Sequence, residues 1–345
     1  MATADITVRG AGIFGLSIAW VLTRRGARVQ VIDPNGVAAG ASGGIVGALA
    51  PHVPENWNPK KQFQLESLLM AERFWADVEA EGGTSPGYAR TGRCQPIADD
   101  AALALAEQRA ATAKGLWGEV ATWIVRPITN PDWAANSTMG MEIFDTLSAR
   151  IHPRQACHAL AAALKTKGVT IAEDAPETST VINATGVAGL ETLNASHTRM
   201  IGTGIKGQAA LLDFAAPDAP QLFADTLHII PHADGTTAIG STTERDYDNP
   251  TGTDAQLDDI LTRARTAVPA LKDAKVVAKW AGLRPRARSR APMLGPWPDR
   301  PGHYIANGGF KIGFGMAPKV AHTMADLILE GRDTIPQGFE VATSF

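Results

Sequence analysis

The sequence has little cysteine and almost no excess charge, and each scarcity excludes a class of protein. Cys94 and Cys157 are the two cysteines among 345 residues. They form no C-x-x-C pattern, so neither a disulfide framework nor a zinc knuckle is expected. The net charge of −3 gives no general attraction to nucleic acid or to an anionic membrane. The histidines show no metal-ligand spacing, and we expect no metal.

Long apolar runs and targeting segments are also lacking. No run approaches the ~18 apolar residues that favour a membrane-spanning helix. The N-terminal segment "MATADITV" has neither the basic nor the apolar region of a leader peptide. These features predict a soluble, cytoplasmic protein without a membrane partner. The chain is rich instead in hydrophobic residues, at 45%, and in glycine, with 34 residues, which allows one large or two smaller packed domains.

Three glycines near the N-terminus form a G-x-G-x-x-G motif within "VRGAGIFGLSIAWVLTRRGARVQVID", residues 8–33. The motif lies between strand-like and helical patterns, which is the context typical of dinucleotide binding. Gly10 permits a tight turn, Gly12 lets the backbone approach a pyrophosphate, and Gly15 lets the helix pack on the strand. Asp33 would accept hydrogen bonds from an adenosine ribose, which disfavours NADP. The motif alone does not choose between FAD and NAD.

The rest of the chain alternates between helical and strand-like patterns. The small-residue stretch 38–59 is nearly uncharged, which suits a loop under a flat ring system, and 61–81 is typical of an amphipathic helix. A strand-like run ends at Ala184, Thr185 and Gly186 and predicts a second backbone contact with the cofactor. We therefore expect an α/β protein with a discontinuous Rossmann-like dinucleotide-binding domain and a second, sheet-rich substrate domain.

In order along the chain, these segments resemble the D-amino-acid oxidase-like family of FAD-dependent oxidoreductases, and especially its glycine oxidase branch of thiamine biosynthesis. The resemblance covers nearly the whole chain. It is carried by "ASGGIVGALAPH", "GIKGQ", "HIIPHADGTTAIGSTTE", and "WAGLRP" followed by "NGGFKIGFGMAP". It implies that the cofactor is FAD. The layout implies an FAD-binding domain over 1–85, 146–204 and 276–345, and a substrate-binding domain over 86–145 and 205–275.

The cofactor contacts expected from the motif, the Ala-Thr-Gly strand end and the resemblance together form one set. Residues 309–315 would meet the pyrimidine edge of the flavin. Between "GVTIAED" and "VINATG", the strand pair usual in the family is replaced here by "APETST", near the adenine contact that the resemblance implies at Ala175. The cysteine that binds flavin covalently in sarcosine oxidases is missing from "LRPRARS", so noncovalent FAD is expected. The full set is Gly10, Gly12, Ile13, Phe14, Gly15, Asp33, Pro34, Ala41, Ser42, Val46, Gly47, Ala48, Ala175, Ala184, Thr185, Gly186, Gly309, Phe310, Lys311, Ile312, Gly313, Phe314 and Gly315.

Arg284 in "WAGLRP" is the expected substrate-binding cation. The resemblance places it where the family clamps the substrate carboxylate, and a guanidinium can hold a carboxylate by two hydrogen bonds. Arg286, Arg288 and Arg290 follow it, and we expect this run to be solvated rather than functional.

Three further side chains are candidates for the substrate site. His228 replaces a tyrosine of glycine oxidases, which argues for a substrate other than plain glycine, and Lys311 replaces an arginine. Both are candidates for catalysis as well as for substrate binding. Lys311 precedes an expected helix start that would face negative charge on the reduced flavin. His52, at the end of the flavin loop, is a further substrate-binding candidate.

These residues predict oxidation of the C–N bond of a small amine or amino acid, such as glycine, a D-amino acid or an N-substituted glycine. A hydride would pass to flavin N5, and water would hydrolyse the imine. The electron acceptor is O₂ or another molecule, because Ala238 stands where sarcosine-oxidase-type members place a lysine over the flavin. The sequence does not predict the oligomeric state.

Three alternatives remain at this stage. An enzyme of the same fold demodifies carboxymethylaminomethyl-uridine in tRNA; the arginine run favours it and the pI of 6.2 opposes it. An NAD-dependent dehydrogenase is supported by the first forty residues alone. A flavin-binding protein without catalytic activity is the third.

Overall fold

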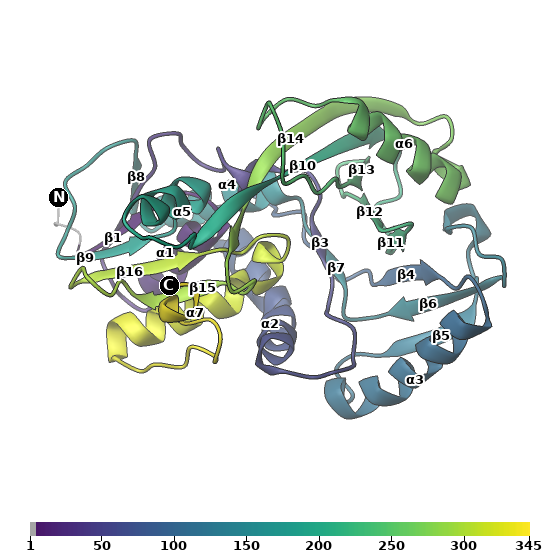
Figure 1. Cartoon of the computed structure of the whole chain (residues 1–345), viewed down its shortest axis with the longest axis horizontal. Coiled ribbons are helices and arrows are strands. Elements are labelled where there is room, and N and C mark those ends of the chain that lie inside the picture. The colour runs from purple at the N-terminus through teal and green to yellow at the C-terminus, as the bar shows by residue number, and fades with distance from the viewer. Residues whose placement is uncertain (1–4) are drawn as a thin grey trace.

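The computed structural model describes residues 5–345, and within them two large sheets lie side by side (Figure 1). The first sheet has six strands in the order β15-β16-β9-β1-β2-β8. The strands from β16 to β8 run parallel, and β15 pairs antiparallel at one edge. Its strands are β1 (Ile6–Arg9), β2 (Val29–Ile32), β8 (Thr170–Ala172), β9 (Thr180–Asn183), β15 (Met293–Pro296) and β16 (His303–Asn307).

The second sheet has eight strands in the order β14-β10-β13-β12-β11-β4-β6-β5. Neighbouring strands are antiparallel, except for the parallel pair β11 and β4. A short antiparallel pair, β3 and β7, lies between the two large sheets (Figure 1). The strands are β3 (Ala48–Leu49), β4 (Arg93–Pro96), β5 (Trp123–Pro127), β6 (Met141–Asp145), β7 (Ala149–Arg150), β10 (Gly202–Asp213), β11 (Gln221–Ala224), β12 (Leu227–Pro231), β13 (Thr236–Gly240) and β14 (Lys275–Ala287).

Helices from distant parts of the chain pack around the two sheets. α1, α4 and α7 contact the six-stranded sheet, and α2 packs on α4 and α7. α5 lies between β16 and the long strands β10 and β14, while α6 covers part of the eight-stranded sheet and α3 packs on β5. The helices are α1 (Ile13–Arg24), α2 (Pro59–Gly82), α3 (Asp100–Trp117), α4 (Pro153–Thr166), α5 (Gly186–Ala195), α6 (Ala255–Ala267), α7 (Gly313–Glu330) and α8 (Val341–Ser344).

Local sequence signals explain where these helices begin and end. Asn58 caps α2 by accepting a hydrogen bond from the backbone N–H of Lys61 at 3.1 Å, and Pro59 occupies the first turn. Gly83 ends the helix in the left-handed conformation at φ +64°. The N-cap of α1 is instead Gly12, which has no side chain to accept from the first-turn amides. The two helices therefore begin differently: α2 is capped by its own N-cap side chain, and α1 is not.

The long strands β10 and β14 run antiparallel along most of their lengths, from Gly202 opposite Ala287 to Asp213 opposite Lys275. α5 of the dinucleotide side packs against both, so this ribbon joins the two parts of the molecule. The expected α/β architecture, with a Rossmann-like parallel sheet and a second sheet-rich part, is confirmed. The predicted residue ranges of the two domains stay a prediction. They assign most of β14 to the FAD-binding domain, whereas in the structure β14 pairs with β10 in the eight-stranded sheet.

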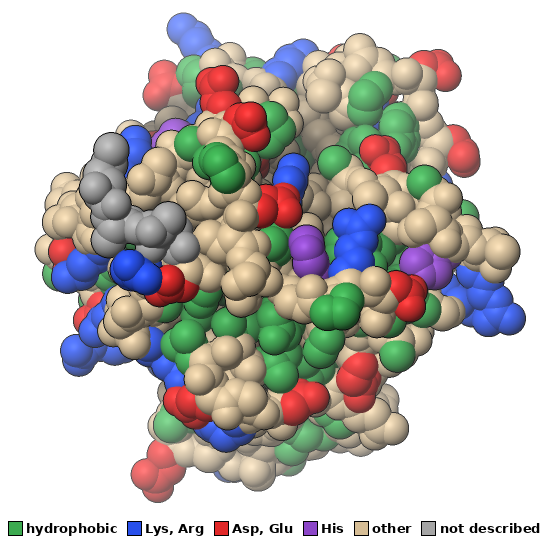
Figure 2. Space-filling model, turned by 90° about the vertical axis from the view of Figure 1, so that its left-hand side faces the viewer, with side chains coloured by type: hydrophobic (Ala, Val, Ile, Leu, Met, Phe, Trp, Pro, Cys, Tyr) green, Lys and Arg blue, Asp and Glu red, His purple; other side chains and the backbone are tan. Residues whose placement is uncertain are grey.

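The surface carries mixed charge. Figure 2 shows Lys and Arg side chains interspersed with Asp and Glu across one face of the molecule. None of the helices in residues 5–345 combines the length and apolar character needed to cross a membrane. Nor does this part of the chain bring three or more His, Cys, Asp or Glu residues together as a metal site.

Candidate active site

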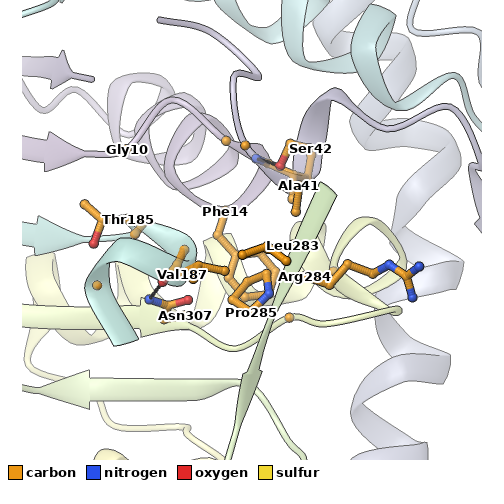
Figure 3. A pocket seen from close by; sticks show the side chains of 18 of the residues that line it. Gly10, Phe14, Ala41, Ser42, Thr185, Val187, Leu283, Arg284, Pro285 and Asn307 are labelled. Carbon is orange, nitrogen blue, oxygen red and sulfur yellow. Dashed lines mark hydrogen bonds between the residues drawn. The ribbon is translucent and has the colours of Figure 1, made fainter. Parts of the chain in front are cut away.

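A cavity of about 1040 Å³ is lined by residues from both large sheets and from the loops at their edges. Figure 3 shows its wall: Gly10, Phe14, Ser42 and Thr185 come from the dinucleotide side, and Arg284 extends away from them. We call the end at α1 and the six-stranded sheet the nucleotide end, and the end at β11, β12, β14 and Ser241, which follows β13, the substrate end. The two ends are built differently.

At the nucleotide end, the N-termini of three helices meet the cavity. Lining residues include Ile13 at the start of α1, Gly186 at the start of α5 and Gly313 at the start of α7. None of these three helices has a hydrogen bond from its N-cap side chain in the described chain. Helix N-termini present backbone N–H groups and partial positive charge, so this end suits a diphosphate and other anionic groups.

Glycine is required where α1 leaves β1. Gly10 has φ +104°, and a Cβ there would lie 2.4 Å from the carbonyl oxygen of Ala184. A Cβ on Gly15 would lie 1.9 Å from the carbonyl oxygen of Gly10. Both approaches are closer than any side chain permits. The motif thus provides the tight turn and the close helix–strand packing predicted from its spacing.

Asp33 and Ser42 hold the turn in place. One carboxylate oxygen of Asp33 accepts from the backbone N–H of Ala11 at 2.7 Å, and the other accepts from Asn35 at 3.0 Å. The hydroxyl of Ser42 accepts from the backbone N–H of Ile13 at 2.9 Å. Each carboxylate oxygen has a second lone pair, so Asp33 can also accept from a ribose hydroxyl at the cavity.

The expected cofactor residues divide into those that line the cavity and those that lie behind its wall. Gly15 packs on Gly10, and a Cβ on Gly47 would lie 1.7 Å from the carbonyl oxygen of Ile151, so these glycines act through close packing. The residues outside the lining set are Gly15, Gly47, Ala175, Ile312 and Gly315. Those that line the cavity are Gly10, Gly12, Ile13, Phe14, Asp33, Pro34, Ala41, Ser42, Val46, Ala48, Ala184, Thr185, Gly186, Gly309, Phe310, Lys311, Gly313 and Phe314.

At the substrate end, Arg284 on β14 is the central cation. Its Nη2 donates to the hydroxyl of Ser241 and to the carbonyl oxygen of Thr242, each at 3.0 Å. Its Nη1 is buried and has no hydrogen-bond partner among the described residues. Burial lowers the pKa of Arg284 to about 10, opposed in part by Glu244, so the guanidinium stays charged at neutral pH. A buried cation with an unused donor is suited to bind an anion.

The segment Ser241–Glu244 that holds Arg284 is itself anchored by the "GIKGQ" strand. Lys206 forms an ion pair with Glu244 at 3.2 Å, and Gln208 donates to the same carboxylate at 3.1 Å. Between them, a Cβ on Gly207 would lie 1.2 Å from Nη2 of Arg284. This strand motif therefore leaves space for the guanidinium and fixes the segment that positions it.

Lys311 and His228 also line the substrate end. Nζ of Lys311 donates to the hydroxyl of Thr243 at 2.7 Å. Desolvation and the neighbouring Arg284 lower the pKa of Lys311 to about 8. Burial, reinforced by the charges of Arg93 and Lys311, lowers the pKa of His228 to about 3. His228 is therefore a neutral hydrogen-bonding group at physiological pH, with its buried Nδ1 unpartnered in residues 5–345.

Other candidates lie away from the cavity. His52 is bound through its backbone N–H and its ring to the side chain of Gln64 on α2, and it does not belong to the residues lining the cavity. Ala238 is buried within the eight-stranded sheet. In the arginine run, Arg286 lies over the ring of Phe310, with 5.7 Å between Cζ and the ring centroid. The guanidinium of Arg288 donates to the backbone of Phe345 at 3.1 Å.

Several wall residues were not predicted from the sequence. Asn307, at the end of β16, is buried and donates to the carbonyl oxygen of Gly186 at 2.8 Å. The sequence signal that could have indicated Asn307 is its position at the end of a strand, directly before Gly308 and Gly309. Phe223, Ser241 and Trp280 line the substrate end, and no spacing rule connects them, because they come from three separate strands or strand ends.

These features fit FAD. One continuous cavity of about 1040 Å³ joins the helix N-termini and the carboxylate of Asp33 to the end that contains Arg284. Cofactor-facing glycines leave room that a Cβ would fill: one on Gly309 would lie 2.9 Å from the ring of Phe14. The backbone amides at the helix N-termini suit the diphosphate that joins a flat flavin ring to adenosine.

Comparison with known proteins agrees with this geometry. A family model described as "FAD dependent oxidoreductase" (DAO) matches residues 5–327. The chain is 27% identical to glycine oxidase of Pseudomonas aeruginosa over 360 residues, which cover 96% of each protein. Its fold is similar to that of glycine oxidase from Geobacillus kaustophilus, with a TM-score of 0.84, 20% identity and 98% of each chain covered. Iminodiacetate oxidase from a Chelativorans species gives a TM-score of 0.83 at 22% identity, covering 96% of this chain and 97% of that one.

The family match decides between the two dinucleotides that the glycine motif left open. It is an FAD-dependent family, so the cofactor is FAD, and the alternative of an NAD-dependent dehydrogenase is removed. The resemblance read from the sequence blocks is confirmed over nearly the whole chain. The chain belongs to the DAO family of FAD-dependent oxidoreductases.

Proposed function

We propose that this enzyme oxidises the C–N bond of a small amine or amino acid that carries a carboxylate. The observation that supports this most directly is Arg284, a buried guanidinium at the substrate end whose Nη1 has no hydrogen-bond partner in residues 5–345. Relatives are named for glycine and for iminodiacetate, both of which place a carboxylate one carbon from the amine nitrogen. FAD, when bound, supplies the acceptor for a hydride at flavin N5.

In this proposal, Arg284 binds the substrate carboxylate and fixes the position of the neighbouring carbon. His228 orients the amine as a neutral hydrogen-bonding group. The positive charges of Arg284 and Lys311 disfavour a protonated amine beside them, so the bound nitrogen loses its proton to water and no side-chain base is needed. Loss of a hydride from carbon and of a proton from nitrogen leaves an imine. Water then adds to the imine and releases a carbonyl compound and ammonia or an amine.

The cofactor contacts follow from the same geometry. We propose that Asp33 binds the adenosine ribose, that the N-terminus of α1 binds the diphosphate, and that the backbone from Gly309 to Gly313 meets the flavin pyrimidine edge. Both cysteines are free and buried, and neither lines the cavity, which supports noncovalent binding. Acid precipitation should therefore release the flavin into the supernatant, and yellow colour retained in the pellet would contradict this.

Reduction of the flavin under anaerobic conditions tests the proposed activity. The panel comprises glycine, sarcosine, D-amino acids, and N-methyl and N-carboxymethyl amines, each mixed with the flavin-loaded enzyme. We expect bleaching of the flavin absorbance by at least one carboxylated amine. A flavin that no member of the panel bleaches would contradict the proposed activity and favour a flavin-binding protein without catalysis. Reoxidation with O₂ or an artificial dye then identifies the acceptor.

A further inference from the structure

Two cations of the substrate end are bound to one short segment. Arg284 donates to Ser241 and Thr242, and Lys311 donates to Thr243. The Cα atoms of residues 241 and 243 are at most roughly 7 Å apart, because an extended chain gains ~3.3–3.6 Å per residue. The guanidinium and the ammonium are therefore held close to each other, and each lines the same cavity.

Within residues 5–345, neither cation forms an ion pair with a carboxylate. Among residues 5–345, the acidic residues that line the cavity are Asp33 and Glu177. Asp33 holds the turn before α1, and Glu177 pairs with Arg9. Glu244 acts electrostatically on Arg284, but its carboxylate is already bound to Lys206 and Gln208. The substrate end therefore presents two positive charges without a matching pair of negative ones.

The ammonium of Lys311 is directed toward the substrate end. Its backbone lies just before α7, yet its Nζ reaches Thr243 beyond the end of β13. The flavin edge expected at residues 309–315 already faces the backbone N–H groups at the start of α7, which begins without a side-chain cap in the described chain. The lysine charge is thus available to a second ligand group.

A second cavity gives that group space. It has a volume of about 510 Å³, and it shares Thr226 and Ser241 with the main cavity. Thr243, the partner of Lys311, lines this second cavity. Its charged lining residues in the described chain are Asp259 and Arg263, which form an ion pair at 3.6 Å and so offset each other. The resemblance to glycine oxidases implies an arginine at the position of Lys311, so positive charge alone does not distinguish this enzyme from them. The adjoining space and the replacement of their tyrosine by His228 are the features that set its substrate end apart.

We propose, building on the amine oxidation proposed above, that the preferred substrate is an amine bearing two acidic groups, an amino- or iminodicarboxylate. Arg284 binds the carboxylate next to the reacting carbon, and Lys311 binds the second one at the junction of the two cavities. Two anions then neutralise two cations, and the buried Nη1 of Arg284 gains its partner.

The proposed preference for dicarboxylates can be tested without turnover, by measuring equilibrium binding of simple carboxylates to the flavin-loaded enzyme. Malonate and succinate are compared with acetate and propionate, each titrated while the flavin absorbance spectrum is recorded. We expect each dicarboxylate to bind at least tenfold more tightly than the monocarboxylates. Equal affinities would overturn the inference.

Variants at the second cation sharpen the test. Lys311→Met should reduce the ratio of dicarboxylate to monocarboxylate affinity at least fivefold, and Thr243→Val, which keeps the lysine but removes its anchor, should reduce that ratio less. Lys319→Met on α7, which loses only an ion pair with Glu66 at the surface, is the matched control and should keep the ratio. If Lys311→Met lowers the affinities for dicarboxylates and monocarboxylates by the same factor, the lysine contributes only general positive charge to the site. Its specific role in binding a second carboxylate would then be overturned.

The two proposals fail in different ways. If carboxylated amines bleach the flavin but dicarboxylates bind no better than monocarboxylates, the amine oxidation stands and the dicarboxylate class is wrong. If dicarboxylates bind tightly and no amine of either class bleaches the flavin, the two-cation site stands and the proposed oxidation is wrong.

Discussion

The two ends of the cavity are built by different means. The nucleotide end uses the backbone: glycines at positions 10, 12 and 15, and three helix N-termini. The substrate end uses side chains, with Arg284, Lys311 and His228 carried by separate elements of the chain. A backbone site changes little when residues are exchanged around it, whereas a side-chain site changes with each substitution. This difference predicts that the two ends can be damaged separately.

The largest effect is expected from Arg284→Ala. Loss of a buried charge-assisted pair costs ~2–5 kcal/mol, so kcat/KM for a carboxylated amine should fall by about 30- to 5000-fold. The flavin content should remain that of the wild type, because Arg284 lies at the substrate end. Steady-state kinetics and the flavin-to-protein absorbance ratio measure both quantities. Arg288→Ala, whose guanidinium contacts Phe345, is the control. Loss of flavin from Arg284→Ala would contradict the prediction that the two ends bind their ligands independently.

Asp33→Ala should produce the reverse pattern. It removes hydrogen bonds to a carboxylate, each worth ~1.5–3 kcal/mol, so the dissociation constant for FAD should rise by about 10- to 150-fold. With saturating FAD, the KM for substrate should match the wild type. Ultrafiltration and flavin fluorescence report retention, and Asp77→Ala on the surface provides the comparison. Full flavin occupancy after prolonged dialysis would rule out the ribose role of Asp33.

Gly207→Ala examines the packing behind the guanidinium. A Cβ at this position would lie 1.2 Å from Nη2 of Arg284, and overpacking of this kind costs ~1–3 kcal/mol. We expect a rise in KM of about 5- to 150-fold with FAD retained. Gly115→Ala in α3, where a Cβ meets open space, should behave as wild type. An unchanged KM in Gly207→Ala would show that the position of Arg284 matters little.

His228→Phe should have the smallest effect. A neutral hydrogen bond contributes ~0.5–1.5 kcal/mol, so kcat/KM should fall by about 2- to 13-fold. Because the pKa of His228 is lowered to about 3, its charge does not change between pH 5 and 8. The ratio of wild-type to variant kcat/KM should therefore be constant over that range. A ratio that changes with a midpoint near 6.5 would show that this histidine titrates at its ordinary pKa.

The nucleotide end was predictable because its signal is local. The glycines, the helix after them and Asp33 lie within 8–33. The structure has the tight turn at Gly10 and the close packing at Gly15 that the spacing predicts, while the ribose contact of Asp33 stays a prediction. Gly15 and Gly47 show the limit of such reasoning, since both act behind the cavity wall through close backbone approaches. The strand order of the six-stranded sheet depends on contacts between distant segments. The sequence therefore predicts the α/β fold class but not this order.

The substrate end was predictable only in part because its contacts are distant in the chain. Arg284, Lys311 and His228 could be named from the resemblance, but the bond between Arg284 and Ser241 spans 43 residues. No local pattern connects those two positions. His52 followed from its place after the flavin loop, and the structure turns it toward Gln64 on α2 instead. The role of "GIKGQ" depends on the contact between Gly207 and the guanidinium of Arg284, 77 residues away in the chain, which no local pattern indicates.

Rapid mixing of the flavin-loaded enzyme with matched amines, in the absence of oxygen, tests the central claim most directly. Sarcosine is compared with dimethylamine, which lacks the carboxylate, in the wild type and in Arg284→Ala. The account predicts that the wild-type flavin is reduced at least 100-fold faster by sarcosine at equal low concentration, and that the variant loses this preference. Equal reduction by both amines in the wild type, or a preference that survives in Arg284→Ala, would contradict it.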